Sequence, residues 1–220
     1  MSADASNKDW QAWHSRYDDA GSYLSRRLAC VQQRLRDGIE ACGPGPIRIL
    51  SLCAGQGRDV LGVVAGHPRA DDISARLVEL DGTNAAVARA TAADHDLRGV
   101  EVVAGDASTT DAAVGAVPAD IVLLCGIFGN ITDDDIERTI AATPMLCAPG
   151  ATVLWTRHRA EPDLTPSIRR WFDEAGFQEL GFDAPDDVLF SVGAERLVAD
   201  PAPFAVGRRL FTFVGPAALA

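Results

Sequence analysis

A glycine turn between an apolar segment and a helix is the part of the sequence best suited to binding a ligand. Residues Ile47 to Leu52 form an apolar run, and Gly55 and Gly57 follow it on either side of Gln56, before a helix-like segment that begins near Arg58. Glycine lets the chain turn sharply and lets a ligand approach the main chain. The helix would direct free N–H groups toward that ligand. The same order of elements also occurs in ordinary turns, so its meaning depends on the rest of the chain.

An acidic residue lies where nucleotide-binding folds hold a ribose. Asp81 follows an expected second strand from Ala75 to Leu80, at a spacing from Gly57 that is close to that of ribose-binding acids. Its carboxylate could accept hydrogen bonds from both ribose hydroxyls. Glu79 points the same way, because strand side chains alternate, and it is the second candidate. Asp106, after a third strand, could accept the exocyclic amino group of an adenine.

Two histidines and several other residues are candidates for activating or contacting a substrate that binds beside the first ligand. His158 is the first candidate for a general base and His14 is the second, because imidazole titrates near neutral pH. The candidate substrate contacts are Tyr17, Phe128, Asn130 and Trp155. Their aromatic members could flank a planar or cationic small molecule, and they could equally be core residues.

The composition predicts one acidic globular protein. Its 220 residues are 47% apolar, with a mean hydropathy of +0.04, which suits a single well-packed domain. A formal net charge of -11 argues against nucleic-acid partners, which need a basic surface. Five cysteines without a Cys-x-x-Cys pair indicate reduced thiols in the cytoplasm rather than disulfides or a metal site. The polar stretch from Met1 to Asp9 and the lack of a long apolar segment predict neither a signal peptide nor a membrane partner.

An amphipathic helix precedes the glycine turn. Five apolar residues recur on one helical face after Ser22, a plausible N-cap: Leu24, Leu28, Val31, Leu35 and Ile39. We expect residues 1–42 to form a helical lid or substrate segment, and residues 43–220 to form the ligand-binding domain.

The remaining elements predict an α/β fold. Further strands are expected at 100–104, 121–124, 151–155, 188–192 and 204–214, with helices between the earlier ones. Without a helix to link them, the last two strands should pair as an antiparallel hairpin. The predicted architecture is a Rossmann-like, doubly wound, mostly parallel sheet of seven strands with an antiparallel C-terminal hairpin strand. In it the first and fourth strands would be neighbours, so that Cys53 and Cys125 would face one another across a crevice.

The order and spacing of these motifs resemble class I S-adenosylmethionine-dependent methyltransferases, from Ile47 to the final hairpin. The matching pieces are Leu-Cys-Ala-Gly-Gln-Gly-Arg-Asp, Leu-Val-Glu-Leu-Asp, Ala-Gly-Asp-Ala and Leu-Cys-Gly. The resemblance implies S-adenosylmethionine as cofactor, S-adenosylhomocysteine as product, and direct in-line methyl transfer to an oxygen or nitrogen of a small molecule. The residues that it places at the cofactor are Ser51, Cys53, Ala54, Gly55, Gly57, Asp81, Gly105, Asp106, Ala107, Cys125 and Gly126.

Two positions depart from the family pattern. Ser51 stands where the family often has Asp or Glu, and Cys53 where it often has the first glycine. The cofactor's methionine amino group is therefore expected to rely more on main-chain carbonyls or on the N-terminal segment.

Two other functions remain open at this point. A nicotinamide-dependent oxidoreductase would share the turn, but such enzymes usually carry a third glycine, where this chain has Val60. A non-catalytic domain that binds the cofactor or assembles with a partner is the other possibility. The polar residues expected at the crevice, Asn130, Thr156 and His158, favour an enzyme.

Overall fold

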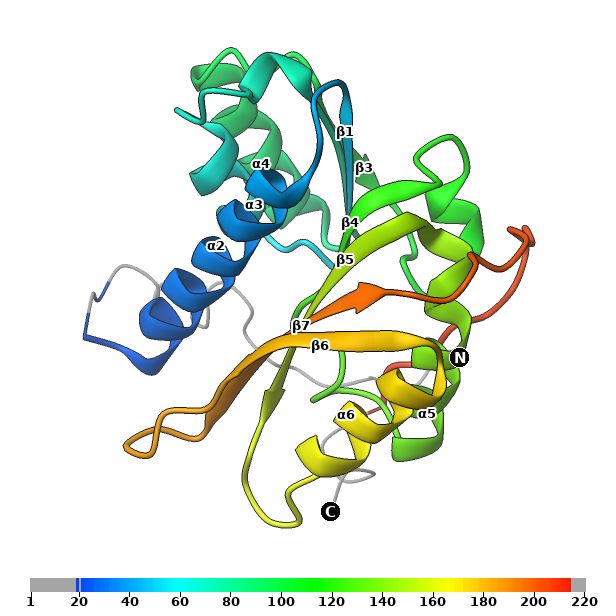
Figure 1. The fold of residues 1–220 in the computed structure, drawn as a ribbon. Coiled ribbons are helices and arrows are strands. Elements are labelled where there is room, and N and C mark those ends of the chain that lie inside the picture. The colour runs from blue at the N-terminus through cyan, green and yellow to red at the C-terminus, as the bar shows by residue number, and fades with distance from the viewer. Residues whose placement is uncertain (1–18, 20, 215–220) are drawn as a thin grey trace, which may run out of the picture.

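The computed structural model describes residue 19 and residues 21–214, which form a seven-stranded sheet in the order β3-β2-β1-β4-β5-β7-β6 (Figure 1). The strands are β1 (Ile47–Leu52), β2 (Ile73–Glu79), β3 (Val100–Ala104), β4 (Ala119–Leu124), β5 (Cys147–His158), β6 (Phe177–Asp183) and β7 (Phe190–Leu197). The first five are parallel, and β7 is antiparallel to both β5 and β6. This confirms the predicted fold class.

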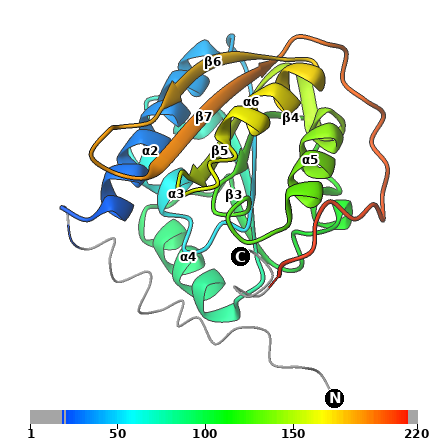
Figure 2. The same cartoon turned by 90° about the horizontal axis from the view of Figure 1, so that it is seen from below.

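Helices cover both faces of the sheet (Figure 2), and each face has its own apolar core. On one face lie α2 (Tyr23–Ala41), α3 (Arg58–Val64) and α4 (Gly82–Asp94); on the other lie α5 (Asp133–Ala142) and α6 (Thr165–Glu174). The central strands β1 and β4 are buried at every position except Arg48 and Asp120, as expected for parallel strands covered on both sides.

The amphipathic helix α2 forms as predicted. Ser22 caps it, because its hydroxyl accepts a hydrogen bond from the Ser25 N–H at 3.1 Å. Val31, Leu35 and Ile39 pack into the same core as α3 and β1. Gln32 donates to the Arg58 carbonyl at 2.9 Å, which fixes α2 to the first turn of α3. Residues 1–18 lie outside the described part of the chain, so the lid stays a prediction.

The C-terminal hairpin is present, but it uses different residues from those expected. It consists of β6 and β7, whereas the expected strand at 204–214 does not enter the sheet. That segment packs Leu210 and Phe211 into the core and bonds to loops instead, through Leu210 N–H to the Ser108 carbonyl and Thr212 N–H to Asp135. Leu210 and Phe211 are buried, whereas Val206 and Phe213 are exposed, and among the described residues the segment forms only an isolated β-bridge, from Arg209 to Thr109.

Candidate functional site

The glycine turn lies at the carboxyl edge of the sheet, where β1 and β4 are neighbours and the winding reverses (Figure 2). Gly55 and Gly57 have φ angles of 58° and 68°, in the region that favours glycine. The turn is fixed at both ends, because the Ala54 N–H donates to the Val78 carbonyl and the Gly57 N–H to the Ala54 carbonyl, each at 2.9 Å. Sheets of this kind bind ligands in the crevice at such a switch point.

Glu79 joins the glycine turn to the end of β2. One carboxylate oxygen accepts a hydrogen bond from the Gly55 N–H at 2.7 Å, and the other accepts from the Asp81 N–H at 2.8 Å. Each oxygen keeps a second lone pair for a ligand hydroxyl. Glu79 is half-buried, so its charge lies directly beside the turn that a ligand would cross.

Asp81 is exposed and caps the next helix. Its carboxylate accepts a hydrogen bond from the Asn84 N–H at 2.9 Å, at the start of α4. Among the described residues none donates a hydrogen bond to its Oδ2, which leaves that oxygen available for a ribose hydroxyl. From the sequence, Glu79 is the second candidate for the ribose contact, after Asp81. Its contact with Gly55, which could not be deduced from strand alternation, places it closer to the turn.

Asp106 offers an ionised acceptor after β3. Burial by itself would raise the pKa of Asp106, but hydrogen bonds from Ser108 and the charge of Arg209 outweigh it, so the pKa is lowered. Its neighbour Gly105 donates to the Glu79 carbonyl at 3.0 Å, while Ala107 is buried in the core. The ends of β2 and β3 therefore present three carboxylates, a donor set that fits ribose hydroxyls and an adenine amino group.

The loop after β4 is fixed by side chains from β5 and from the loop itself. Gly126, with a φ of 77°, donates its N–H to the Thr156 hydroxyl at 2.9 Å and accepts from the Asn130 amide at 2.7 Å. Arg157 donates to the Phe128 carbonyl. Apart from Gly126 and its two chain neighbours, no atom of the described residues lies within 4 Å of the position that a Cβ would take there, so the main chain is open to a ligand.

The two cysteines at the crevice do not face one another as expected. Cys53 packs against the core beneath α5 and α6, and Cys125 against the core beneath α2 and α3. Burial is the main cause that raises the pKa of each thiol, which disfavours a nucleophilic role. Cys53 has a φ of 56°, in the left-handed region that favours glycine, which is the residue expected from the family pattern at this position.

His158 lies at the end of β5 with an exposed ring. Its Nδ1 accepts a hydrogen bond from the Ala160 N–H at 3.1 Å, which places the proton of the neutral ring on Nε2. The lone pair that a base needs is thus engaged by the main chain. The second candidate base, His14, lies outside the described residues, and so does Tyr17, one of the predicted substrate contacts.

Two aromatic residues predicted to contact substrate belong to the core instead. Phe128 and Trp155 are both 0% exposed, and their ring centroids are 6.2 Å apart in a cluster with Phe172. Gly193 on β7 leaves room for the Trp155 indole, since a Cβ there would lie 2.1 Å from it. Of the three predicted substrate contacts within the described residues, only Asn130 lies at the crevice, where its amide donates to the Gly126 carbonyl.

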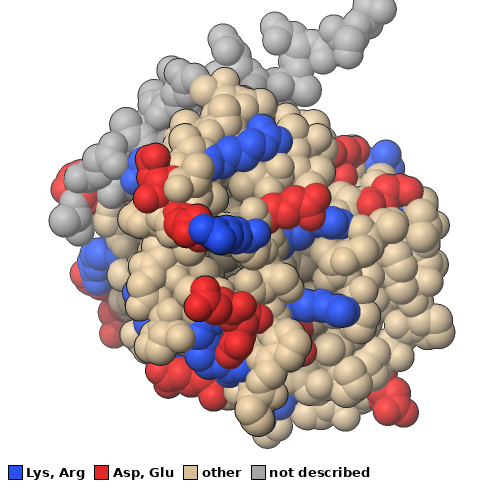
Figure 3. Space-filling model, turned by 90° about the horizontal axis from the view of Figure 1, so that it is seen from above, with Lys and Arg blue, Asp and Glu red and all other residues tan. Residues whose placement is uncertain are grey.

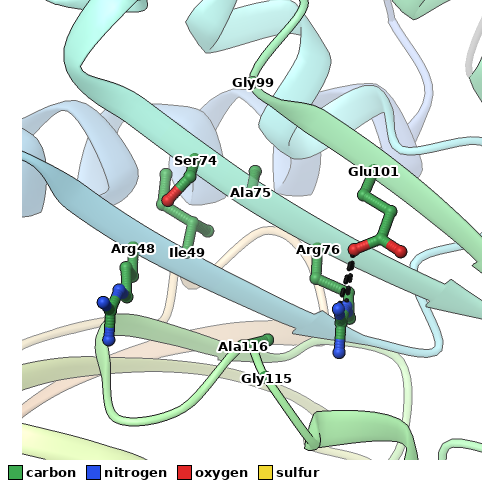
Figure 4. Close-up of a pocket in the computed structure, with 9 residues that line it drawn as sticks. All are labelled: Arg48, Ile49, Ser74, Ala75, Arg76, Gly99, Glu101, Gly115 and Ala116. Carbon is green, nitrogen blue, oxygen red and sulfur yellow. Dashed lines mark hydrogen bonds and ion pairs between the residues drawn. The ribbon is translucent and has the colours of Figure 1, made fainter.

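Two cavities among the described residues lie at the opposite, amino edge of the sheet. The smaller, of about 100 Å³, is bordered by Arg48, Ser74 and an ion pair between Arg76 and Glu101 at 2.8 Å (Figure 4). The larger, of about 420 Å³, is mostly apolar and lies against 201–206. Neither contains a residue of the glycine turn, so neither is the candidate site.

Comparison with known proteins gives one family match and several structural ones. A family model described as "Putative methyltransferase" matches residues 23–170, which is more than half of the chain. No curated protein sequence matches the chain. Among solved structures, an O-methyltransferase family protein from Burkholderia thailandensis is 18% identical with a TM-score of 0.62, over 91% of this chain and 62% of that one. This chain therefore spans less than two thirds of that protein's length.

Two further structures were solved with ligands. The 1,6-didemethyltoxoflavin-N1-methyltransferase of Burkholderia thailandensis, with 1,6-didemethyltoxoflavin and S-adenosylhomocysteine bound, is 17% identical with a TM-score of 0.61, over 90% of this chain and 94% of that one. The magnesium protoporphyrin IX methyltransferase of Synechocystis PCC 6803, with S-adenosylmethionine bound, is 11% identical with a TM-score of 0.65, over 86% and 91%. At these identities the likeness concerns the fold.

Proposed function

The chain belongs to the class I S-adenosylmethionine-dependent methyltransferase family, and we propose that it transfers a methyl group from S-adenosylmethionine to a small-molecule acceptor. The observation that carries this proposal is the contact between the glycine turn and the carboxylate at the end of the neighbouring strand, Gly55 N–H to Glu79. The contact places the main chain of the glycine turn beside a carboxylate that can accept hydrogen bonds from hydroxyl groups. Both lie at the carboxyl edge, where sheets of this kind bind ligands.

The proposed cofactor site follows the crevice from β3 to β4. Asp106 accepts from the adenine, Glu79 and Asp81 hold the ribose, and the main chain of Gly55 and Gly126 borders the rest. The donors and acceptors available there suit this cofactor, as judged from their chemistry and from the open main chain at Gly126. The bound structures of the two relatives support the same ligand class.

The protein's part in the reaction is alignment. The cofactor supplies a methyl group that its sulfonium already activates. The protein has to bring the acceptor atom into line with it and exclude water. The loop from Gly126 to Asn130 is suited to positioning the acceptor. Hydrogen bonds with the side chains of Thr156 and Asn130 fix Gly126 just after the C-terminal end of β4. Such alignment can lower a barrier by about 7 kcal/mol or more in favourable systems.

A small-molecule acceptor fits the charge of the protein. The amino edge shows Lys and Arg interspersed with Asp and Glu rather than a continuous basic surface (Figure 3). The formal net charge of -11 disfavours a nucleic-acid acceptor. Among the described helices, none has both the length and the apolarity to cross a membrane. The acceptor atom is proposed to be oxygen or nitrogen, in keeping with the O- and N1-methyltransferase relatives.

His158 is proposed as a general base. For this role its Nδ1 must give up the hydrogen bond from the Ala160 N–H and take the proton of the acceptor group instead. If it does so, His158→Ala should lower turnover by about 10²- to 10⁴-fold. The measurement is transfer of a labelled methyl group to a panel of phenols and amines, from pH 5 to pH 9. An unchanged profile rejects the role and leaves alignment as the protein's contribution.

Thermal unfolding with S-adenosylmethionine, S-adenosylhomocysteine and NAD in parallel tests the proposed function. Each methionine-derived ligand, at a hundred times its dissociation constant, should stabilise the protein by about 2.7 kcal/mol. For a chain of this size that is a rise of roughly 5 to 10 °C in Tm. NAD should give no shift. A shift with NAD alone would contradict the proposal, and binding without methyl transfer to any acceptor would favour a non-catalytic domain.

A further inference from the structure

Arg157 brings a positive charge to the carboxyl edge of the sheet. It lies on β5, which continues beyond the end of β4, because Trp155 pairs with Leu124, the last residue of β4, and Arg157 is two residues further along. The Ser191 hydroxyl on β7 donates to the Arg157 carbonyl at 2.9 Å and fixes the main chain there. Arg157 is therefore level with the loop after β4 that borders the proposed site.

The side chain of Arg157 contacts that loop directly. Its Nη1 donates to the Phe128 carbonyl and lies 3.8 Å from the position that a Cβ would take at Gly129. The opposite edge of the guanidinium consists of Nε and Nη2, and neither nitrogen has a hydrogen-bond acceptor among the described residues. Within that part of the chain, Nε is the only buried polar side-chain atom without a partner.

The charge of Arg157 is partly removed from water without a direct counter-charge. Arg157 is half-buried, and burial lowers the pKa of its guanidinium, whereas the charges of Asp133 and Asp163 act in the other direction. Neither carboxylate forms an ion pair with it among residues 21–214, and Asp163 instead accepts from the Thr165 N–H and hydroxyl. Buried donors are almost always bonded, since an unbonded one loses its hydration without compensation. The exception at Arg157 indicates a partner that binds from outside the protein.

We propose that the Nε and Nη2 edge of Arg157 binds an anionic group of the methyl acceptor, a carboxylate or a phosphate. The inference rests on the proposed function and narrows the acceptor to an organic anion. Two parallel N–H donors match two oxygens of either group. Because Nη1 is bonded to the Phe128 carbonyl, the anion is held beside the loop that is proposed to align the acceptor.

Thermal unfolding of the complex with S-adenosylhomocysteine, at constant ionic strength, tests this inference. The probes are benzoate and phenyl phosphate, with benzamide as a neutral molecule of similar shape. At least one of the two anions should raise the Tm of the wild-type complex with increasing concentration, and benzamide should not. Arg157→Gln removes the charge and should weaken binding of that anion about 10- to 100-fold, the usual effect of losing a charged hydrogen bond. Comparison of the two anions distinguishes a carboxylate from a phosphate.

Two further variants separate anion binding from support of the loop. Arg157→Lys keeps the charge and a donor for the Phe128 carbonyl but lacks the two parallel donors, so it should retain only part of the response to the anion. Arg89→Gln is the matched control, because Arg89 on α4 also donates to a main-chain carbonyl, that of Val102 on β3. This variant should respond to the anion as the wild type does.

The affinity for S-adenosylhomocysteine is the readout that a purely structural role would change. Arg157→Gln should bind this ligand as the wild type does, because Thr156 and Asn130 still hold Gly126. Equal loss of S-adenosylhomocysteine and anion binding would assign Arg157 to the position of the loop and overturn the inference. An unchanged anion response in Arg157→Gln, or no response of the wild-type complex to either anion, would also overturn it while leaving the proposed function intact. Failure of the wild-type protein to bind S-adenosylhomocysteine would instead overturn both.

Discussion

Replacement of Glu79 by glutamine is expected to weaken S-adenosylhomocysteine binding by about 100-fold, because roughly 3 kcal/mol of charged hydrogen bonding is lost. The glutamine has one acceptor oxygen, while the carboxylate serves both the Gly55 N–H and the Asp81 N–H. The variant therefore loses ligand contacts and the connection that sets the position of the glycine turn. Calorimetric titration at low and moderate salt measures the change.

Asp81→Asn is the matched control for this prediction. Asparagine caps a helix about as well as aspartate, so α4 should keep its start while the charge is lost. We expect a smaller effect than in Glu79→Gln, because Asp81 is exposed and directs one oxygen at Asn84. If Asp81→Asn weakened binding as much or more, the ribose would be held by Asp81, as the spacing of the motif predicted.

Glu195→Gln is expected to stabilise the protein at pH 8 by about 3 kcal/mol, a rise in Tm of roughly 6 to 12 °C. Glu195 is 2% exposed on β7, where its Oε1 accepts the Trp155 indole N–H at 3.1 Å. Burial above all raises its pKa from 4.5 to about 7. The folded protein therefore binds this proton more tightly than the unfolded chain does. Protonation of Glu195 therefore stabilises the folded protein fully below pH 4.5, and this stabilisation is lost as the pH rises through 7.

Unfolding curves between pH 5 and pH 8 test this prediction. The wild-type Tm should fall relative to that of Glu195→Gln as the pH rises, and the two should differ little near pH 5. Glu137→Gln, an exposed change on α5, should follow the wild type throughout. Parallel curves for the wild type and Glu195→Gln would show that Glu195 has an ordinary pKa and that its burial has little energetic effect.

The order of the parallel strands could be predicted because local pattern and connection rules agree. Apolar runs at β1 and β4, each followed by a turn and a helix, allow few topologies other than the observed one. Ser22 was recognised as a helix cap for a similar reason, since a cap depends on residues only three positions away.

The hairpin could not be located in the same way. Residues 177–183 form β6, yet they do not alternate clearly between buried and exposed positions. Residues 204–214 do carry an apolar pattern, but they pack against loops. Burial produces such a pattern whether or not a neighbouring strand supplies hydrogen bonds.

By itself, the sequence determined the class of fold, the position of the glycine turn and the family, because these depend on the spacing of residues along the chain. Only the tertiary structure decided which carboxylate meets the turn, that Phe128 and Trp155 are core residues, and that Glu195 lies in desolvated surroundings. These properties depend on contacts between residues far apart in sequence. Alternation along a strand gives the face of a side chain, but its partners come from the packing of other elements against that face.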